Sequence, residues 1–240
     1  KHDRIVLSNV PILTIDLTYN RQSPYRYFKV KMSSKVKKKI LKLKESSTLV
    51  INEKSKELIS KGKKVYQFGF GQSPFPVPEK IVEALKKNAH RKEYLPIQGL
   101  PELRKNISKY LSRRTGNDYP KENILITPGS KEAMLLIHIA FNGEIIIPAP
   151  GWVSYEPQAE IGSNKVHWLE TTRENNWFPT GKELEKKIKT VGKNKNLILI
   201  LNSPNNPSGV VCENLEELAK IAKKYKIMVL SDEIYTDLTF

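Results

Sequence analysis

The sequence is poor in cysteine and has no long apolar run. A single cysteine, Cys212, stands among 240 residues. One cysteine excludes an intrachain disulfide framework and a zinc site with several cysteine ligands, and it favours a reducing, cytoplasmic location. The most apolar stretch, residues 133–150, is interrupted by polar side chains and falls short of the roughly 20 apolar residues that a membrane-spanning helix needs. We therefore expect no membrane span, and the first residues contain no secretory hydrophobic segment.

The sequence also lacks the motifs of several common ligand sites. It contains no Gly-Lys-Ser/Thr phosphate loop and no Gly-x-Gly-x-x-Gly fingerprint, which are typical of nucleotide and dinucleotide sites. Its four histidines show no spacing typical of metal ligands, so we predict no metal site.

Acidic residues are few compared with basic ones. The chain has 41 lysines and arginines against 25 aspartates and glutamates, a formal net charge of +16. Half of this excess lies in residues 35–64, which contain eleven lysines but neither arginine nor aromatic residues. Proteins that bind single-stranded nucleic acid combine cations with stacking aromatic rings. We therefore interpret the segment as a solvated basic surface and predict no nucleic-acid partner.

Strand and helix patterns alternate along the second half of the chain. Alternation of this kind predicts an α/β fold, with a mostly parallel sheet covered by helices on both faces. The first half is expected to hold an extended arm over 1–34, helices over 48–61, after Pro78 and after Pro101, and a strand over 65–70. We divide the chain into an N-terminal arm with a basic helical segment, 1–64, and a large domain, 65–240. The strands expected in the second half are 124–127, 144–147, 165–170, 197–201 and 227–230, with helices over 131–141, 154–161, 182–189 and after Asn214, where Glu217 favours a helix start.

Three polar clusters follow strands of the expected sheet, at the edge where parallel α/β sheets bind ligands. Gly129, Ser130 and Lys131 join a strand to a helix start, which is either a phosphate site or an ordinary helix cap. Asn206 lies in an Asn-Pro-Ser-Gly sequence and either binds a ligand or stabilises a turn. Asp232 follows a buried strand, so its carboxylate needs a partner, either a protonated ring nitrogen or a basic side chain.

Three aromatic residues are further candidates. Trp152 follows a strand end, where its ring either covers a flat ligand or packs against the core. Tyr94 and Tyr235, taken alone, are expected to be packing residues.

Taken together and in this order, the motifs are far more specific than any one alone. They are the strand-to-helix turn at Gly129, the aromatic Trp152, the loop at Asn206 and the Ser-Asp-Glu-Ile-Tyr sequence that contains Asp232. From about residue 33 to residue 240 the sequence resembles the fold-type I pyridoxal-phosphate enzymes, specifically the class I/II aminotransferases typified by aspartate aminotransferase. The resemblance implies the large domain of that fold and a homodimer that exchanges an amino group between an amino acid and a 2-oxo acid.

The resemblance also implies roles for the candidate residues. Ser130 and Lys131 match positions that hold the cofactor phosphate, and Trp152 matches the aromatic residue stacked on the pyridine ring. Asp232 matches the carboxylate that keeps the pyridine nitrogen protonated, so that the ring acts as an electron sink. Tyr235 matches a donor to the ring hydroxyl, and Asp232 and Tyr235 are the catalytic candidates.

Three further correspondences concern the ring, the substrate and the neighbouring subunit. Asn206 matches the asparagine that binds the ring hydroxyl and lies beside the substrate. Gly71 matches a glycine near the substrate carboxylate. Tyr94 matches a tyrosine that reaches the cofactor phosphate of the neighbouring subunit.

The sequence departs from the family pattern after Asp232, because no lysine follows that residue. The family uses a downstream lysine to bind the cofactor as a Schiff base, so we expect the 240 residues alone to be nearly inactive. Two alternatives stay open at this point. One is another pyridoxal-phosphate reaction on the same scaffold, a C–S lyase or a decarboxylase. The other is a non-catalytic relative that acts as an interaction module.

Overall fold

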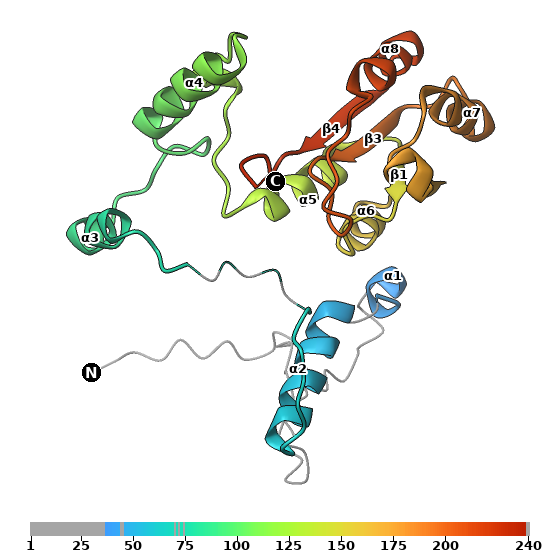
Figure 1. Ribbon diagram of the computed structural model, residues 1–240. Coiled ribbons are helices and arrows are strands. Elements are labelled where there is room, and N and C mark those ends of the chain that lie inside the picture. The colour runs from blue at the N-terminus through green and yellow to red at the C-terminus, as the bar shows by residue number, and fades with distance from the viewer. Residues whose placement is uncertain (1–36, 44–45, 70, 72, 74, 239–240) are drawn as a thin grey trace, which may run out of the picture. The chain divides into compact units, whose positions relative to one another are not determined.

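The computed structural model describes residues 37–43, 46–69, 71, 73 and 75–238 (Figure 1). The chain divides into two units, residues 1–43 and 44–240. The first unit contributes one short described helix, α1 (Lys38–Leu41), and the arm expected over 1–34 lies outside the described residues. Within the described residues, no helix is long and apolar enough to cross a membrane.

The second unit contains a four-stranded parallel sheet. Its strands are β1 (Glu144–Ala149), β2 (Val166–Glu170), β3 (Leu197–Asn202) and β4 (Met228–Asp232), in the order β2-β1-β3-β4. Within the described chain, β4 pairs with β3 only, in a register that places Asn202 opposite Asp232. The central strand β3 is buried along its whole length, which explains its uninterrupted apolar sequence before Asn202.

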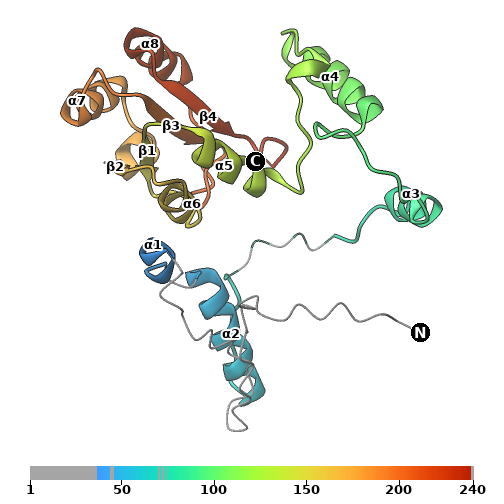
Figure 2. The same ribbon diagram turned by 180° about the vertical axis from the view of Figure 1, so that it is seen from behind.

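Two pairs of helices cover the sheet (Figures 1 and 2). Helices α5 (Ser130–Ala140) and α6 (Tyr155–Gly162) pack on one face, and α7 (Gly181–Val191) and α8 (Leu215–Tyr225) pack on the other. Alternate residues of β1 and β3 enter the two cores: Ile145, Ile147, Ile198 and Ile200 toward α5 and α6, and Ile146, Leu197, Leu199 and Leu201 toward α7 and α8. The predicted parallel sheet with helices on both faces is therefore confirmed.

Local sequence signals explain where several helices begin and end. Pro101 is the first residue of α4 (Pro101–Thr115), and Gly116 ends that helix in the left-handed conformation with φ of 76°. Helix α7 begins with a capping box, in which the Thr180 hydroxyl accepts from the Glu183 amide and the Glu183 carboxylate accepts from the Thr180 amide. Asn214 precedes α8 as expected, but its side chain donates to the Pro179 carbonyl and to Glu217 instead of capping the helix.

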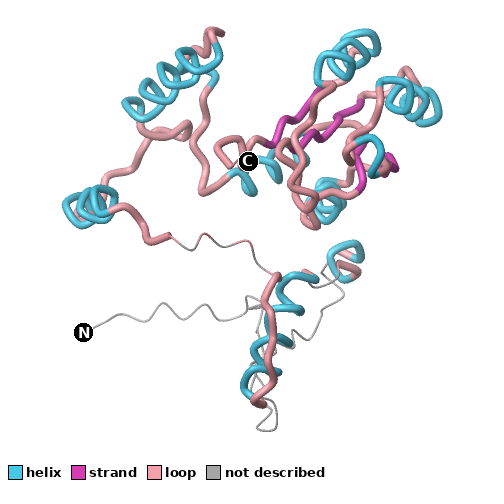
Figure 3. The backbone as a smooth tube through the Cα atoms, viewed as in Figure 1, coloured by secondary structure: helices cyan, strands magenta, loops and turns pink. Residues whose placement is uncertain are grey.

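The first half of the second unit is helical, with loops between the helices (Figure 3). Helices α2 (Ser47–Ser60) and α3 (Glu79–Asn88) precede α4, and short 3-10 turns cover Lys121–Asn123 and Arg173–Asn175. The strands predicted over 65–70 and 124–127 are wrong for the described residues, which have no strand there. Tyr66 and Phe68 are exposed, and the Ile126 amide donates to the Gln98 carbonyl without extending into a ladder. β-type residues form a strand only where another strand pairs with them.

Glu144 at the start of β1 gives the sheet a pH-dependent stability. The Lys195 ammonium, 2.6 Å from Glu144 Oε1, is the largest cause that holds the pKa of Glu144 below its usual value, and His167 adds to it. A carboxyl whose pKa is lowered on folding stabilises the folded state above its unfolded pKa, and this stabilisation is lost as the pH falls through the folded pKa. We expect Glu144→Gln to lower the free energy of unfolding by about 1 kcal/mol at neutral pH.

The expected difference in the free energy of unfolding between Glu144→Gln and the unsubstituted chain disappears in acid, because the protonated glutamic acid and the glutamine at position 144 are then both uncharged. Urea unfolding at neutral pH and at a pH well below the usual glutamate pKa measures both points. Glu160→Gln, an exposed position on α6, is the matched control and should have no effect at either pH. An equal loss of stability at both pH values would contradict an electrostatic role for Glu144.

Candidate functional site

The predicted site residues from three strands come together at one edge of the sheet. Trp152 and Asn206 lie in the loops that follow β1 and β3, and Asp232 is the last residue of β4. Because the strands are parallel, their carboxyl ends share this edge, next to which α5 begins. Side-chain contacts connect the loops after β1 and β3, the end of β4 and the start of α5.

Asp232 is the last residue of β4 and is buried, with 8% of the residue exposed. The Tyr155 hydroxyl donates to Asp232 Oδ2 over 2.7 Å, and the Ile234 amide donates to Oδ1 over 3.3 Å. Among the described residues, Asp232 forms no ion pair, so the alternative of a salt bridge to a basic side chain has no support. A buried carboxylate without a cation is available to a positively charged ligand.

Tyr155 is the first residue of α6 and is 1% exposed. Burial raises the pKa of the Tyr155 hydroxyl, and the hydrogen bond to Asp232 and the charge of that carboxylate raise it further. Tyr155 therefore keeps its proton at neutral pH and acts as the donor to Asp232. Its ring lies edge-on to the Trp152 ring, with centroids 5.5 Å apart.

Asn206 and Tyr235 approach each other from the loops after β3 and β4. The Asn206 side-chain amide lies 3.5 Å from the Tyr235 hydroxyl, at the outer limit of a hydrogen bond. Asn202 holds the backbone of the loop after β3 in place. Its Oδ1 accepts from the backbone amide of Asn206 over 2.6 Å, and its Nδ2 donates to the backbone carbonyl of Asp232 over 2.9 Å. Asn202 thereby connects the loop that carries Asn206 to the end of β4, where Asp232 lies.

The start of α5 has the features of an anion site. Gly129 precedes the helix with φ of 88°, a conformation that favours glycine, and no described side chain caps the first turn. A Cβ at Gly129 would meet no atom within 4 Å, so the space beside the helix start is open. The Lys131 ammonium lies 5.5 Å from the centroid of the Trp152 ring. Free amides, an open approach and a nearby cation together favour a phosphate over an ordinary cap.

Two predicted site residues do not join this group in the structure. Tyr94 is fully exposed in the loop before α4, and no contact between it and the site is present in the described part of the chain. Gly71 is also exposed, with no atom within 4 Å of the position of a Cβ. Their assignments to a neighbouring subunit and to the substrate stay predictions.

Sequence reasoning missed two residues that organise the site, Tyr155 and Asn202. It places Asn205 beside Asn206 in one polar cluster but gives Asn205 no role of its own. Asn205 is buried, donates to the Pro150 carbonyl and accepts from the amide and hydroxyl of Ser208, so it joins the loop after β1 to the loop after β3. One signal could have found Asn202, because it ends an otherwise apolar strand. For Tyr155 the partner is 77 residues away in the sequence, and no local pattern marks it.

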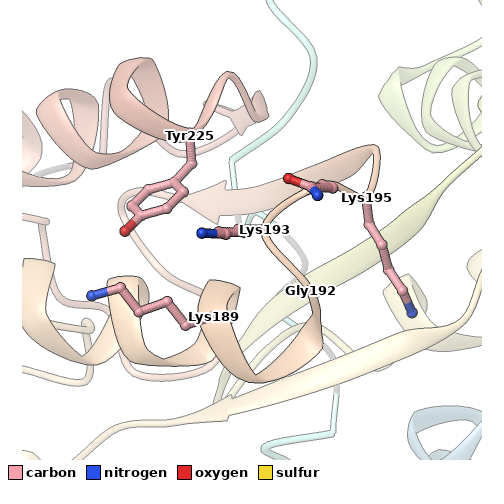
Figure 4. Close-up of a pocket in the computed structure, with 6 residues that line it drawn as sticks. Lys189, Gly192, Lys193, Lys195 and Tyr225 are labelled. Atoms are coloured by element: carbon pink, nitrogen blue, oxygen red, sulfur yellow. The ribbon is translucent and has the colours of Figure 1, made fainter.

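A surface cavity of about 670 Å³ lies at the opposite edge of the sheet. It is lined by residues at the ends of α7 and α8 and in the turn before β3, among them Lys189, Lys193 and Tyr225 (Figure 4). These residues precede β3 and β4, whereas the site described above follows the same strands. Lys189 and Lys195, which also line the cavity, form ion pairs with Glu185 and Glu144, which offsets part of the positive charge around it.

A sequence model of the family described as aminotransferase class I and II matches residues 63–240, well over half of the chain. The chain belongs to this family. It is 35% identical to the aspartate aminotransferase of Thermotoga maritima, over 85% of this chain and 55% of that enzyme. It is 32% identical to an asparagine–oxo-acid transaminase of Streptococcus mutans, over 86% of this chain and 54% of that protein. The chain spans about half the length of the curated relatives that it matches.

Solved structures of aminotransferases share the fold. The aspartate aminotransferase of Rhizobium meliloti matches with a TM-score of 0.79 and 25% identity, over 87% of this chain and 53% of that chain. The aspartate aminotransferase of Thermotoga maritima matches with a TM-score of 0.77 and 33% identity, over 85% of this chain and 55% of that chain. The sheet and its helices therefore have the large-domain fold of the fold-type I pyridoxal-phosphate transferases.

The family depends on pyridoxal phosphate, and the side chains of the site fit this group. The open helix start at Gly129 with the nearby Lys131 suits the phosphate, and the half-buried Trp152 ring suits a flat heterocycle. Asn206 and Tyr235 offer donors to a phenolic oxygen. The buried Asp232 carboxylate has no cationic partner in the described residues and suits a protonated pyridine nitrogen.

Proposed function

We propose that this chain binds pyridoxal phosphate at the carboxyl edge of its sheet. We further propose that it contributes the cofactor site of an aminotransferase that moves an amino group between an amino acid and a 2-oxo acid. The observation that carries the proposal is the buried Asp232 carboxylate, which has hydrogen-bond donors but no cationic partner among the described residues. The family match and the aminotransferase names of its relatives support the reaction class.

Each site residue has a stated task in this proposal. Asp232 holds a proton on the pyridine nitrogen, and Asn206 and Tyr235 orient the ring through its hydroxyl. The α5 amides, Ser130 and Lys131 bind the phosphate, and Trp152 covers one face of the ring and excludes water. When bound, the cofactor supplies a ring that accepts the electron pair released at the substrate Cα.

The substrates and the assembly are part of the same proposal. The relatives include proteins named aspartate aminotransferase and asparagine–oxo-acid transaminase, which supports an amino acid and a 2-oxo acid as substrates. We propose that Gly71 lies near the substrate carboxylate. We also propose that the protein is a cytoplasmic homodimer, in which Tyr94 contacts the cofactor of the second subunit. A side chain as exposed as Tyr94 is free to make such a contact.

The test is a binding titration with pyridoxamine phosphate, the amine form of the cofactor. The aldehyde form would react with lysines anywhere on a chain with 41 basic residues, whereas the amine form cannot. We expect saturable binding, which tryptophan fluorescence and calorimetry measure. Pyridoxamine without the phosphate should bind at least about 10-fold more weakly, because it loses charge-assisted hydrogen bonds at the start of α5.

Two results would separate specific from adventitious binding. Lys189→Ala in the lysine-rich cavity at the far edge should leave the affinity unchanged, since that residue lies away from the proposed site. Equal affinities for the phosphorylated and unphosphorylated amines would remove the phosphate site. Absence of any saturable binding would overturn the proposed function of this chain.

A further inference from the structure

We infer that Tyr155 is a positioning residue for Asp232 and that its hydroxyl fixes the carboxylate in the orientation that the cofactor ring nitrogen requires. This inference rests on the proposed function and adds to it a residue on α6 that the sequence motifs do not assign. Tyr155 acts through Asp232 and is given no contact with the cofactor.

The geometry restricts the carboxylate of Asp232 to one orientation. The Tyr155 hydroxyl donates to Oδ2 over 2.7 Å, and the Ile234 amide donates to Oδ1 over 3.3 Å. One donor on each oxygen opposes rotation of the carboxylate plane. Each oxygen of an ionised carboxylate has two lone-pair positions, so an acceptor position remains for a ligand.

Tyr155 is itself held firmly, which is what a positioning residue needs. Its ring belongs to the buried cluster between the sheet and helices α5 and α6, together with Met134, Ile147 and Ala159. The Trp152 ring packs against it in a T-shaped arrangement. Because the ring is fixed by packing on several sides, the hydroxyl has little freedom except to point at Asp232.

The hydroxyl also has an electrostatic effect that geometry alone would not supply. A buried carboxylate has lost its hydration, so it depends on hydrogen-bond donors supplied by the protein. The Tyr155 hydroxyl supplies such a charge-assisted hydrogen bond to Oδ2, and a phenylalanine at the same place would not. Removing the hydroxyl therefore leaves Oδ2 without its donor and frees the carboxylate to turn away from the ring nitrogen.

The chain contains a matched contact elsewhere that serves as a control. The Tyr225 hydroxyl on α8 donates to Glu185 over 2.7 Å, the same distance as in the Tyr155 contact. Glu185 and Tyr225 lie on the α7 and α8 face, away from the proposed site. Tyr225→Phe thus removes the same atom from the same kind of bond without touching the site.

The experiment compares two ligands that differ only at the ring nitrogen. They are pyridoxamine phosphate and its analogue in which a C–H group replaces that nitrogen. We expect the unsubstituted chain to prefer the natural ligand, and Tyr155→Phe to reduce this preference about 5- to 10-fold, the equivalent of a hydrogen bond of about 1 kcal/mol. Affinity for the analogue should stay within about 2-fold, and Tyr225→Phe should change neither affinity.

A double variant distinguishes action through Asp232 from general support of the fold. In an Asp232→Asn background the preference for the ring nitrogen is already lost, so adding Tyr155→Phe should have no further effect on it. A preserved preference in Tyr155→Phe would overturn the positioning role and leave the proposed function standing. Absence of any preference in the unsubstituted chain would overturn the ring contact of Asp232 itself, and Tyr155 would lose its role with it.

Discussion

Asp232→Ala is expected to lower the affinity for pyridoxamine phosphate by about 10- to 100-fold, since a hydrogen bond to a charged group contributes about 1.5–3 kcal/mol. The carboxylate is buried, held by Tyr155 and free of any described ion pair, so nothing nearby can replace it at the ring nitrogen. Without that negative charge the ring nitrogen loses its proton and the ring no longer withdraws electrons effectively. Transamination by any polypeptide that contains this sequence and a Schiff-base lysine should then fall below detection.

The measurement for Asp232→Ala is a calorimetric titration with the amine form, supported by circular dichroism to verify folding. Asp237→Ala is the matched control, because Asp237 lies five residues further along, is exposed and pairs with Arg114. That variant should bind as the unsubstituted chain does. An affinity of Asp232→Ala equal to that of the control would refute the assignment of Asp232.

The second large effect concerns stability, and it is expected at the centre of β3. Leu199 is fully buried and belongs to the core formed with α7 and α8, which also contains Ile146, Leu184 and Ile188. Replacing a buried leucine by alanine removes apolar contacts and leaves a cavity, at a cost of about 2–5 kcal/mol. We expect Leu199→Ala to lose free energy of unfolding in that range, which is a large share of the total stability of an ordinary domain.

Urea unfolding followed by far-ultraviolet circular dichroism measures the effect at Leu199. Leu136→Ala on α5 removes the same atoms at an exposed position and should change the free energy of unfolding by less than about 0.5 kcal/mol. A loss below about 1 kcal/mol for Leu199→Ala would contradict the tightly packed core around β3.

The sheet could be predicted from the sequence where burial alone decides the pattern. Residues 145–147 and 197–201 form apolar runs because helices cover both faces of their strands. Residues 65–70 and 124–127 have similar β-type side chains, yet the described residues among them form no strand. A ladder depends on a partner from elsewhere in the chain, and a local pattern does not contain that information.

The site shows the same division between local and distant information. Asp232, Asn206 and Trp152 could be named because each follows a strand at the ligand-binding edge. Tyr155 could not, because its role depends on a side-chain hydrogen bond across 77 positions of the sequence. The hydrogen bonds of Asn205 to the loop after β1 likewise depend on the folded geometry.

Strand β4 has one more consequence, which follows from its place at the edge of the described sheet. Met228 and Val229 are 56% and 44% exposed, and residues 228–231 carry no charge. On the side away from β3, the described chain leaves the amides and carbonyls of this strand unpaired. An uncharged, apolar edge of this kind is a template for intermolecular strand addition and so for aggregation. Solutions of the 240-residue chain should therefore become turbid faster as its concentration rises, and Val229→Lys should slow this process.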